Sequence, residues 1–459
     1  MISIIIPPIL KTISIKLSQN RAKPILVGGS IRDYFLGLPS KDYDVEVFNI
    51  EIDRLIEILS EFGNVNLVGK SFGVLKFSNN GDDYDFSIPR KESKTSSGHR
   101  GFDIETNPNL SFKEASNRRD FTINSMGYDI LKGELLDPYD GYSDIQNRVI
   151  RYVDRDSFIE DSLRVYRGIG FASRFGFKIE ANTQKLFKSM IDRQEFRELS
   201  KERVFIEFNK ILLKSHKPSV GFELIREFGI LKYFPPLQNI IGVPQDSRYH
   251  LEGDVWIHTM MSLDAMAIFK EKNLKLLYAI LCHDLGKATH TQIQNNKISA
   301  IGHEKAGIEP TKEFLYSITN EHKFIDSILP LVEHHLKPSI YFRNGAKNST
   351  IRKLATKVNI SELILVAKAD FLGRTTEESK SRIYRAGEWL ATKSKELEVD
   401  KKPLKPILQG RDLIEIGLKP SKEFGVILEQ IYQLQLDGVV NNREEALKII
   451  NKLDIINKK

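Results

Sequence analysis

The sequence predicts an α+β protein: a mixed β-sheet with helices forms an N-terminal head, and helices form nearly all of the remainder. Residues 25–48 have the pattern of a strand, a glycine turn, a helix and a second strand, and further β-rich runs follow to about residue 89. From about residue 221 onward, apolar residues recur at helical spacing. The 459 residues are enough for two to four domains, and the 41% hydrophobic content supports ordinary packed cores.

The first of these stretches also carries the clearest chemical signal. Gly28 and Gly29 form a turn without side chains, where backbone N–H groups can approach phosphates, and Arg32 adds positive charge. Asp42 and Asp44 occupy alternate positions of the second strand, so we expect both to project from one face. Neighbouring carboxylates repel each other unless a cation lies between them, and hard oxygen ligands suit Mg²⁺. The combination indicates metal-assisted nucleotidyl transfer from a triphosphate; a solvated strand edge is the simpler alternative for the two aspartates alone.

The motifs VGGSIRD and KDYDVEVF resemble those of the class II nucleotidyltransferases of the polymerase β superfamily, which include tRNA CCA-adding enzymes and bacterial poly(A) polymerases. The resemblance implies a polymerase β-like head over residues 1–150, in which Asp42 and Asp44 hold two Mg²⁺ ions. Asp85, at the end of the run DDYDF, is the candidate for a third metal-site carboxylate. An exposed turn shared with Asp82 and Asp83 is the alternative for this residue.

Two further segments of the head carry basic residues. RKESKTSSGHRGFDIETNP is polar and rich in Ser and Gly, which predicts a mobile loop. By resemblance it is the family's flexible loop, whose movement accompanies completion of the added triplet, with Arg90 and Arg100 as its residues of interest. RRDFTINSM resembles the family's RRDFTINAM, with Ser125 in place of the usual Ala. This resemblance implies three residues of a nucleotide- and sugar-binding wall: Arg119, Asp120 and Asn124.

A helical neck is expected over residues 151–220. Asp161 and Arg164 lie three apart on a predicted helix and so share a face, either as an ion pair or as hydrogen-bonding edges for a nucleobase. EDSLRVYR resembles the family's EDxxRxxR motif, which implies that this Asp and Arg select CTP and ATP and that Arg167 contacts the base or triphosphate. Gly168 and Gly170 depart from the usual Ala and Arg and cost the helix on the order of 1 kcal/mol each. LSKERVFIEFNKILL resembles a bracing motif of the family, carried here by Glu202, Arg203 and Glu207.

Histidines and aspartates recur through the predicted helices of residues 221–375. Imidazole and carboxylate groups brought together from several helices can hold a divalent hydrolytic metal ion, whereas each histidine alone would more simply be a packed residue. Their order resembles the HD phosphohydrolase superfamily. The resemblance implies a divalent metal, of unspecified identity, on His258, His283, Asp284 and Asp370. It further implies that Lys287 stabilises phosphate charge and that two histidines serve a second metal or orient substrate: His303 and His334. A metal that only stabilises the fold is the alternative.

Composition limits the remaining assignments. The net charge of +7 permits a nucleic-acid partner without requiring one, and the single cysteine, Cys282, is consistent with a reducing cytoplasm. No run approaches the roughly 18 apolar residues of a membrane span, so a cytoplasmic protein without a membrane partner is expected. Residues 376–459 form a charged helical tail that either follows an RNA backbone or is simply solvated.

The resemblances together imply template-independent addition of C, C and A to the tRNA 3′ end from CTP and ATP, with a second, phosphohydrolase activity in the HD part. Three alternatives stay open. The first is CC addition, A addition or poly(A) synthesis by the same chemistry, the second is mainly an HD-type nucleotide or cyclic-phosphate hydrolase, and the third is a non-catalytic RNA-binding protein. The sequence leaves the oligomeric state open.

Overall fold

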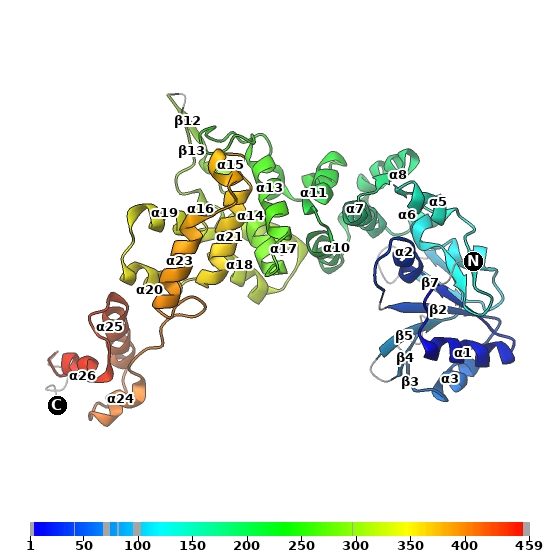
Figure 1. Cartoon of the computed structure of the whole chain (residues 1–459), viewed down its shortest axis with the longest axis horizontal. Coiled ribbons are helices and arrows are strands. Elements are labelled where there is room, and N and C mark those ends of the chain that lie inside the picture. Colours follow the sequence, from blue (N-terminus) through cyan, green and yellow to red (C-terminus); the bar gives the residue numbers. More distant parts are fainter. Residues whose placement is uncertain are drawn as a thin grey trace. The chain divides into compact units, whose positions relative to one another are not determined.

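The computed structural model describes residues 4–40, 42–67, 74–79, 82–94, 102–295 and 297–452. It consists of two compact units: residues 1–215 with 220–233, and residues 216–219 with 234–459 (Figure 1). The first unit contains the mixed sheet, and the second is almost entirely helical, so the predicted α+β class is confirmed. Among the described residues, no helix has both the length and the apolar character needed to cross a bilayer.

The head is built on a mixed sheet of seven strands within the described residues, in the order β3-β4-β5-β2-β1-β8-β9. Neighbouring strands are antiparallel except β2 and β5, which are parallel. The strands are β1 (Lys23–Val27), β2 (Tyr43–Phe48), β3 (Asn64–Leu67), β4 (Val74–Asn79), β5 (Asp82–Ser87), β8 (Gly127–Asp129) and β9 (Glu134–Leu136). Strand β2 is therefore central, with β1 on one side and β5 on the other.

Helices α1 and α3 are amphipathic and pack on each other and on the sheet, with their apolar residues buried. Of the strand ends beside α2, the start of β2 is accessible to solvent at Asp44, whereas Val27 at the end of β1 is buried. The helical segments of the head are α1 (Pro8–Gln19), α2 (Gly29–Phe35), α3 (Ile52–Ser60), α4 (Phe112–Ser116), the 3₁₀ turn η1 (Thr122–Asn124) and α5 (Gly141–Gln146).

The segment predicted as a loop is partly a hairpin. Strands β6 (Arg90–Lys94) and β7 (Phe102–Thr106) pair antiparallel, from Arg90 opposite Thr106 to Lys94 opposite Phe102. Arg90 thus begins a strand. Arg100 lies outside the described residues.

The helical neck is assembled around aromatic rings that pack edge to face. The ring of Phe121, from the head, lies 5.4 Å from that of Phe158 and 6.5 Å from that of Phe187, between centroids. The segments are the parallel pair β10 (Val149–Ile150) and β11 (Lys178–Ile179), α6 (Arg155–Ile159), α7 (Leu163–Phe175), α8 (Ala181–Ile191), α9 (Gln194–Arg197), α10 (Lys201–Lys214), α11 (Pro218–Glu227) and the 3₁₀ turn η2 (Ile230–Tyr233). The glycine at 168 permits this packing, because a Cβ there would lie 2.5 Å from the Phe187 ring and 2.8 Å from that of Phe121.

The second unit is a helical body followed by three tail helices. Helices α13, α14, α18 and α21 pack against one another and carry a continuous buried apolar surface. The body contains α12 (Pro235–Gln238), α13 (Val255–Ala267), α14 (Leu274–Cys282), α15 (Lys287–His290), the hairpin β12 (Gln292–Gln294) and β13 (Lys297–Ser299), α16 (His303–Ala306), α17 (Ile308–Ile318), α18 (His322–His334), α19 (Lys337–Asn344), α20 (Asn348–Ala355), α21 (Ile360–Leu372), α22 (Glu377–Lys380) and α23 (Arg385–Glu396).

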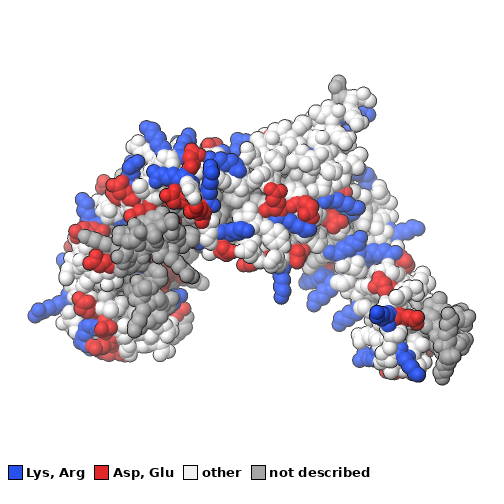
Figure 2. Space-filling model, turned by 180° about the vertical axis from the view of Figure 1, so that it is seen from behind, with Lys and Arg blue, Asp and Glu red and all other residues white. Residues whose placement is uncertain are grey.

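The tail helices are α24 (Gly410–Glu415), α25 (Glu423–Asp437) and α26 (Arg443–Lys452). They enclose an apolar core of their own that includes Leu413, Ile431 and Ile450. The tail is therefore a packed helical element in which only the outer faces are charged. On the face drawn in Figure 2, Lys and Arg side chains are interspersed with Asp and Glu.

Candidate functional site

The head and neck enclose a strongly basic pocket of about 510 Å³ within the first unit. Its lining includes thirteen of the residues named in the sequence analysis: Gly28, Gly29, Arg32, Asp44, Arg119, Asp120, Asn124, Asp161, Arg164, Arg167, Gly170, Arg203 and Glu207. Asp42, just before β2, and Asp85, on β5, are not part of this lining.

The glycine turn lies directly against the carboxylate of the central strand. Gly28 has a φ of +81° and precedes helix α2. A Cβ at this position would lie 3.1 Å from Oδ2 of Asp44 and 3.4 Å from Nη1 of Arg119. Only glycine fits both the left-handed backbone and the close approach. The turn therefore exposes backbone, with no side chain, beside the acidic group.

The strand register brings the predicted carboxylates together. Asp44 is opposite Asp85 in the parallel pair β2 and β5, and paired residues share a face of the sheet. Asp42 is exposed and lies two residues before Asp44. Desolvation raises the pKa of Asp44, Arg119 opposes this shift, and the charges of Asp85 and Asp42 add to it. Mutual repulsion among acidic oxygens is what a bound divalent cation relieves, so this donor set fits a hard metal ion.

The structure adds a buried acid that the sequence analysis did not single out. Glu46 is fully buried, and its Oε1 accepts a hydrogen bond from Nη2 of Arg118 at 3.1 Å, while Nη2 of Arg119 lies 4.0 Å from its Oε2. Burial lowers the pKa of Arg119, and Glu46 opposes that shift. Glu46 continues the alternation of Asp42 and Asp44, and that period of two is the signal that could have identified it. It holds two arginines at the wall of the pocket.

A chain of hydrogen bonds crosses the opposite wall. Nε of Arg167 donates to Oδ2 of Asp120 at 2.7 Å, and Nδ2 of Asn124 donates to Oδ1 of the same carboxylate at 2.9 Å. Nη1 of Arg32 then donates to Oδ1 of Asn124 at 2.6 Å. Burial would raise the pKa of Asp120, but Arg167 and the hydrogen bond from Asn124 lower it, so the carboxylate stays ionised. The ring of Phe171 lies beneath the guanidinium groups of both arginines.

Asp161 and Arg164 both line the pocket, but they do not lie together on one helix as expected. Helix α7 begins at Leu163, and Asp161 precedes it. Oδ1 of Asp161 accepts from the Leu163 N–H at 3.1 Å, and Oδ2 accepts from Nη2 of Arg203 at 2.8 Å. Arg164 donates to the carbonyl of Arg118 at 2.8 Å and to that of Ser157 at 2.9 Å. Both side chains are thus fixed separately, without an ion pair between them.

The second unit contains a buried cluster of histidines and aspartates. His258 from α13, His283 and Asp284 after α14, and Asp370 from α21 are all at most 5% exposed. Nε2 of His258 lies 3.0 Å from Oδ1 of Asp370 and 3.8 Å from Oδ2 of Asp284. Nε2 of His283 lies 3.2 Å from the same Asp284 oxygen. The ligand atoms of His258, His283 and Asp284 all lie within 4.8 Å of one another, which suits a single metal ion.

Asp284 belongs to a second such group, with His303 and His335. Oδ1 of Asp284 lies 3.2 Å from Nε2 of His303 and 3.9 Å from Nε2 of His335. His335 takes the place that the sequence predicted for His334, which lines a different pocket. His334 and His335 are adjacent at the end of α18, so the sequence alone could not show which of the two side chains faces the cluster.

The histidine rings are oriented for ligation through Nε2. Nδ1 of His283, His303 and His335 lies 2.6 to 2.7 Å from the backbone carbonyl three residues earlier, so Nδ1 carries the hydrogen. Nε2 is then the lone-pair nitrogen. For His283 and His303 it is buried and makes no hydrogen bond to any described residue. Buried acceptor atoms left without donors are the environment that a metal ion completes.

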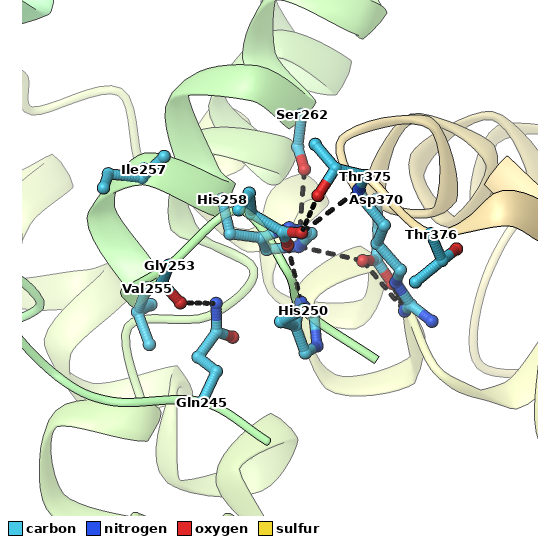
Figure 3. A network of polar contacts seen from close by, with 12 residues as sticks. Gln245, His250, Gly253, Val255, Ile257, His258, Ser262, Asp370, Thr375 and Thr376 are labelled. Carbon is cyan, nitrogen blue, oxygen red and sulfur yellow. Dashed lines mark hydrogen bonds and ion pairs between the residues drawn. The ribbon is translucent and has the colours of Figure 1, made fainter. Parts of the chain in front are cut away.

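Glu252, which the sequence analysis did not single out, supports His258 from behind. Its Oε1 lies 2.8 Å from Nδ1 of His258 and 2.8 Å from Nδ1 of His250, and its Oε2 accepts from the Thr375 N–H at 3.1 Å. Figure 3 shows His250, His258 and Thr375 gathered in this way, with Asp370 contacting the ring of His258. Burial alone would raise the pKa of Glu252, but the hydrogen bonds from His250 and His258 hold it well below the usual range. The anionic carboxylate fixes the tautomer in which Nε2 of His258 faces the cluster.

A cavity of about 340 Å³ opens beside this cluster and is lined partly by basic groups. Nζ of Lys287 lies 2.7 Å from Oδ2 of Asp284 and donates to Oε1 of Gln245 at 2.7 Å. Nη2 of Arg374 donates to both oxygens of Asp370, at 3.0 and 2.9 Å. The cavity therefore places cations next to the candidate metal ligands, as an anionic substrate requires.

Comparison with known proteins agrees with this two-site arrangement. Residues 25–151 match the family "Poly A polymerase head domain", residues 176–241 match "Probable RNA and SrmB- binding site of polymerase A", and residues 255–374 match "HD domain". The multifunctional CCA protein of Pasteurella multocida (strain Pm70) is 35% identical over 369 residues, covering 77% of this chain and 84% of that relative. The chain belongs to the multifunctional CCA protein family. The member from Mannheimia succiniciproducens is 34% identical over 368 residues, covering 76% of this chain and 84% of the relative.

Solved structures of CCA-adding enzymes share the fold of this multifunctional CCA protein family member. The Bacillus stearothermophilus CCA-adding enzyme in complex with CTP has a TM-score of 0.68 at 20% identity, covering 99% of this chain and all of the other. The Thermotoga maritima enzyme complexed with tRNA has a TM-score of 0.59 at 21% identity, covering 98% of this chain and 96% of the other. At these identities the likeness establishes the fold alone.

Proposed function

We propose that this protein is a tRNA nucleotidyltransferase that adds C, C and A to the tRNA 3′ end from CTP and ATP and releases pyrophosphate. The observation that carries the proposal is the basic pocket of the first unit, in which a glycine turn, an acidic strand and the Asp161 and Arg164 pair face one cavity. The relatives named for CCA addition support it, as do the solved CCA-adding enzymes crystallised with CTP, ATP and tRNA.

We propose that the head residues position the nucleotide and stabilise the charge of its triphosphate. Asp42 and Asp44, with Asp85 beside them on β5, are proposed to hold Mg²⁺, which would lower the pKa of the ribose 3′-hydroxyl and neutralise the triphosphate. The backbone at Gly28 and Gly29, together with Arg32, would bind the triphosphate. Arg119, which pairs with Glu46, and Arg167, which pairs with Asp120, would place further positive charge around the leaving pyrophosphate.

Base selection is proposed to lie with Asp161 and Arg164. A carboxylate accepts hydrogen bonds and a guanidinium donates them, so together they can read the Watson–Crick edge of cytosine or adenine. Arg203 and the Leu163 N–H immobilise Asp161, and two backbone carbonyls immobilise Arg164. Side chains already fixed before the nucleotide binds discriminate better than mobile ones, because little ordering is required on binding.

For the second unit we propose a metal-dependent phosphohydrolase activity. His258, His283, Asp284 and Asp370 would hold a divalent metal, with His303 and His335 at a second position. The metal would supply a nucleophilic hydroxide at neutral pH. Lys287 and Arg374 would bind and neutralise the phosphate of the substrate in the adjoining cavity.

The deciding experiment is incorporation of each labelled NTP, singly and in pairs, into tRNA ending at the discriminator base, at C and at CC, with Mg²⁺. We expect CTP and ATP together to complete the CCA end. ATP use only on tRNA ending in CC would indicate A addition, long A tails would indicate a poly(A) polymerase, and no incorporation would refute the transferase. Asp44→Asn should abolish incorporation only, and His283→Ala should abolish phosphate release only, which separates the two activities.

A further inference from the structure

Another polar cavity of the second unit is lined by residues to which neither proposed activity assigns a role. It encloses about 270 Å³ between helices α16, α18, α19 and α20 and shares no lining residue with the cavity beside the metal cluster. Its charged lining is mainly basic and consists of Lys305, Lys337, Lys353, Lys357, Glu304 and Glu333.

The positive charge of this cavity is only partly neutralised. Nζ of Lys353 lies 2.6 Å from Oδ1 of Asp437. Among the described residues, no ion pair forms with Lys305, Lys337 or Lys357. The four lysines of the lining outnumber its two carboxylates, Glu304 and Glu333, and an anion beside the ammonium groups would relieve the excess positive charge.

His334 gives an independent indication of a ligand. Its side chain lines this cavity, yet it is only 6% exposed. Its Nδ1 is buried and makes no hydrogen bond to any described residue, unlike Nδ1 of the neighbouring His335, which bonds a backbone carbonyl. Burying a polar atom without a partner costs about 1–3 kcal/mol, and the side chain that carries this atom lines the cavity, so a turn of the ring that brings Nδ1 to a bound anion would relieve that cost.

We propose that this cavity binds a phosphate group through the ammonium groups of Lys305, Lys337 and Lys357 and the imidazole of His334. Lysine binds phosphate as a mobile point charge, and the hydroxyl groups of Tyr341 and Thr350, which also line the cavity, add neutral hydrogen bonds. The group is either a backbone phosphate of bound RNA or a free phosphate.

The test is lysine acetylation of the full chain with a limiting amine-reactive reagent, quantified by peptide mass spectrometry. It is run in sodium chloride, in inorganic phosphate at equal ionic strength, and with tRNA in chloride. We expect phosphate or tRNA to slow acetylation of Lys337 and Lys357 by about threefold or more, because a lysine in a charge-assisted contact with phosphate is shielded. Lys323, exposed on the same helix as His334, serves as the internal control.

Protection by inorganic phosphate identifies a free phosphate as ligand, and protection by tRNA alone identifies the RNA backbone. Lys357→Glu should remove the protection of Lys337, whereas Lys323→Ala should leave it intact. Equal acetylation in all three solutions overturns the proposal, as does protection of Lys337 that persists in Lys357→Glu. Circular dichroism and melting of each variant separate loss of the anion from loss of the fold.

Discussion

Replacing Glu252 with alanine tests whether the candidate metal centre depends on a carboxylate that need not touch the metal. The side chain of Glu252 is 1% exposed and accepts from four donors: Nδ1 of His258, Nδ1 of His250, and both the N–H and the hydroxyl of Thr375. Its removal leaves these donors without a buried acceptor. At about 1–3 kcal/mol for each buried donor, with water reaching part of the space, we expect the free energy of unfolding of the second unit to fall by roughly 2–5 kcal/mol.

The same substitution should weaken metal binding, because His258 loses the group that fixes its ring and tautomer. Loss of such a supporting hydrogen bond typically lowers metal affinity about 10–100-fold. The assay is a Co²⁺ titration followed by visible absorption, alongside phosphate release from an activated phosphodiester. Glu252→Gln keeps one acceptor oxygen and should fall between wild type and Glu252→Ala, whereas Glu309→Ala, at an exposed ion pair, should match wild type.

Nucleotide incorporation should be unchanged in Glu252→Ala, because no residue of this network lines the pocket of the first unit. Co²⁺ affinity within about twofold of wild type in a folded Glu252→Ala protein would refute the reasoning, since the hydrogen bond to His258 would then contribute nothing to ligation.

Three further outcomes follow from close contacts and ion pairs. Gly286→Ala would place a Cβ 2.0 Å from the His303 carbonyl oxygen, so thermal unfolding should show a loss of roughly 3 kcal/mol. By contrast, Gly425→Ala, in helix α25 with open space around it, should stabilise by up to about 1 kcal/mol. Arg203→Ala frees the Asp161 carboxylate, and kcat/KM for CTP should fall about tenfold or more with relaxed discrimination against UTP; unchanged discrimination would contradict the proposed role. Gly168→Ala would press on the Phe121 and Phe187 rings and should lower the melting temperature despite the better helix propensity of alanine.

The strands and helices of the head could be predicted because the period of the apolar residues and the positions of the glycines specify them. The contacts that orient the functional groups could not be predicted, because they join residues far apart in the chain. Asp161 was expected on the same helix face as Arg164, but the helix begins two residues later, and the partner of Asp161 is Arg203, 42 positions away. Arg118 and Arg119, readily mistaken for surface charges, instead surround the buried Glu46.

In the HD part, too, the sequence order predicted which residues share a site, but it did not predict the contacts between distant residues. The order of histidines and aspartates predicted a shared site, and the helical packing brings His258, His283, Asp284 and Asp370 within a few ångströms. A choice between His334 and His335 depends on how the last turn of α18 faces its neighbours, which spacing alone does not determine. Glu252 went unnoticed because an isolated Glu in a loop has no periodic pattern.

Asp284 belongs to both groups of candidate ligands, and this affects how the two groups would bind metal ions. Its Oδ2 lies near His258 and His283, and its Oδ1 lies near His303 and His335. Cations held by the two groups would share this one carboxylate, so the charge of the first would weaken the attraction of Asp284 for the second. The two affinities would therefore be coupled, and filling one position should change the apparent affinity measured at the other.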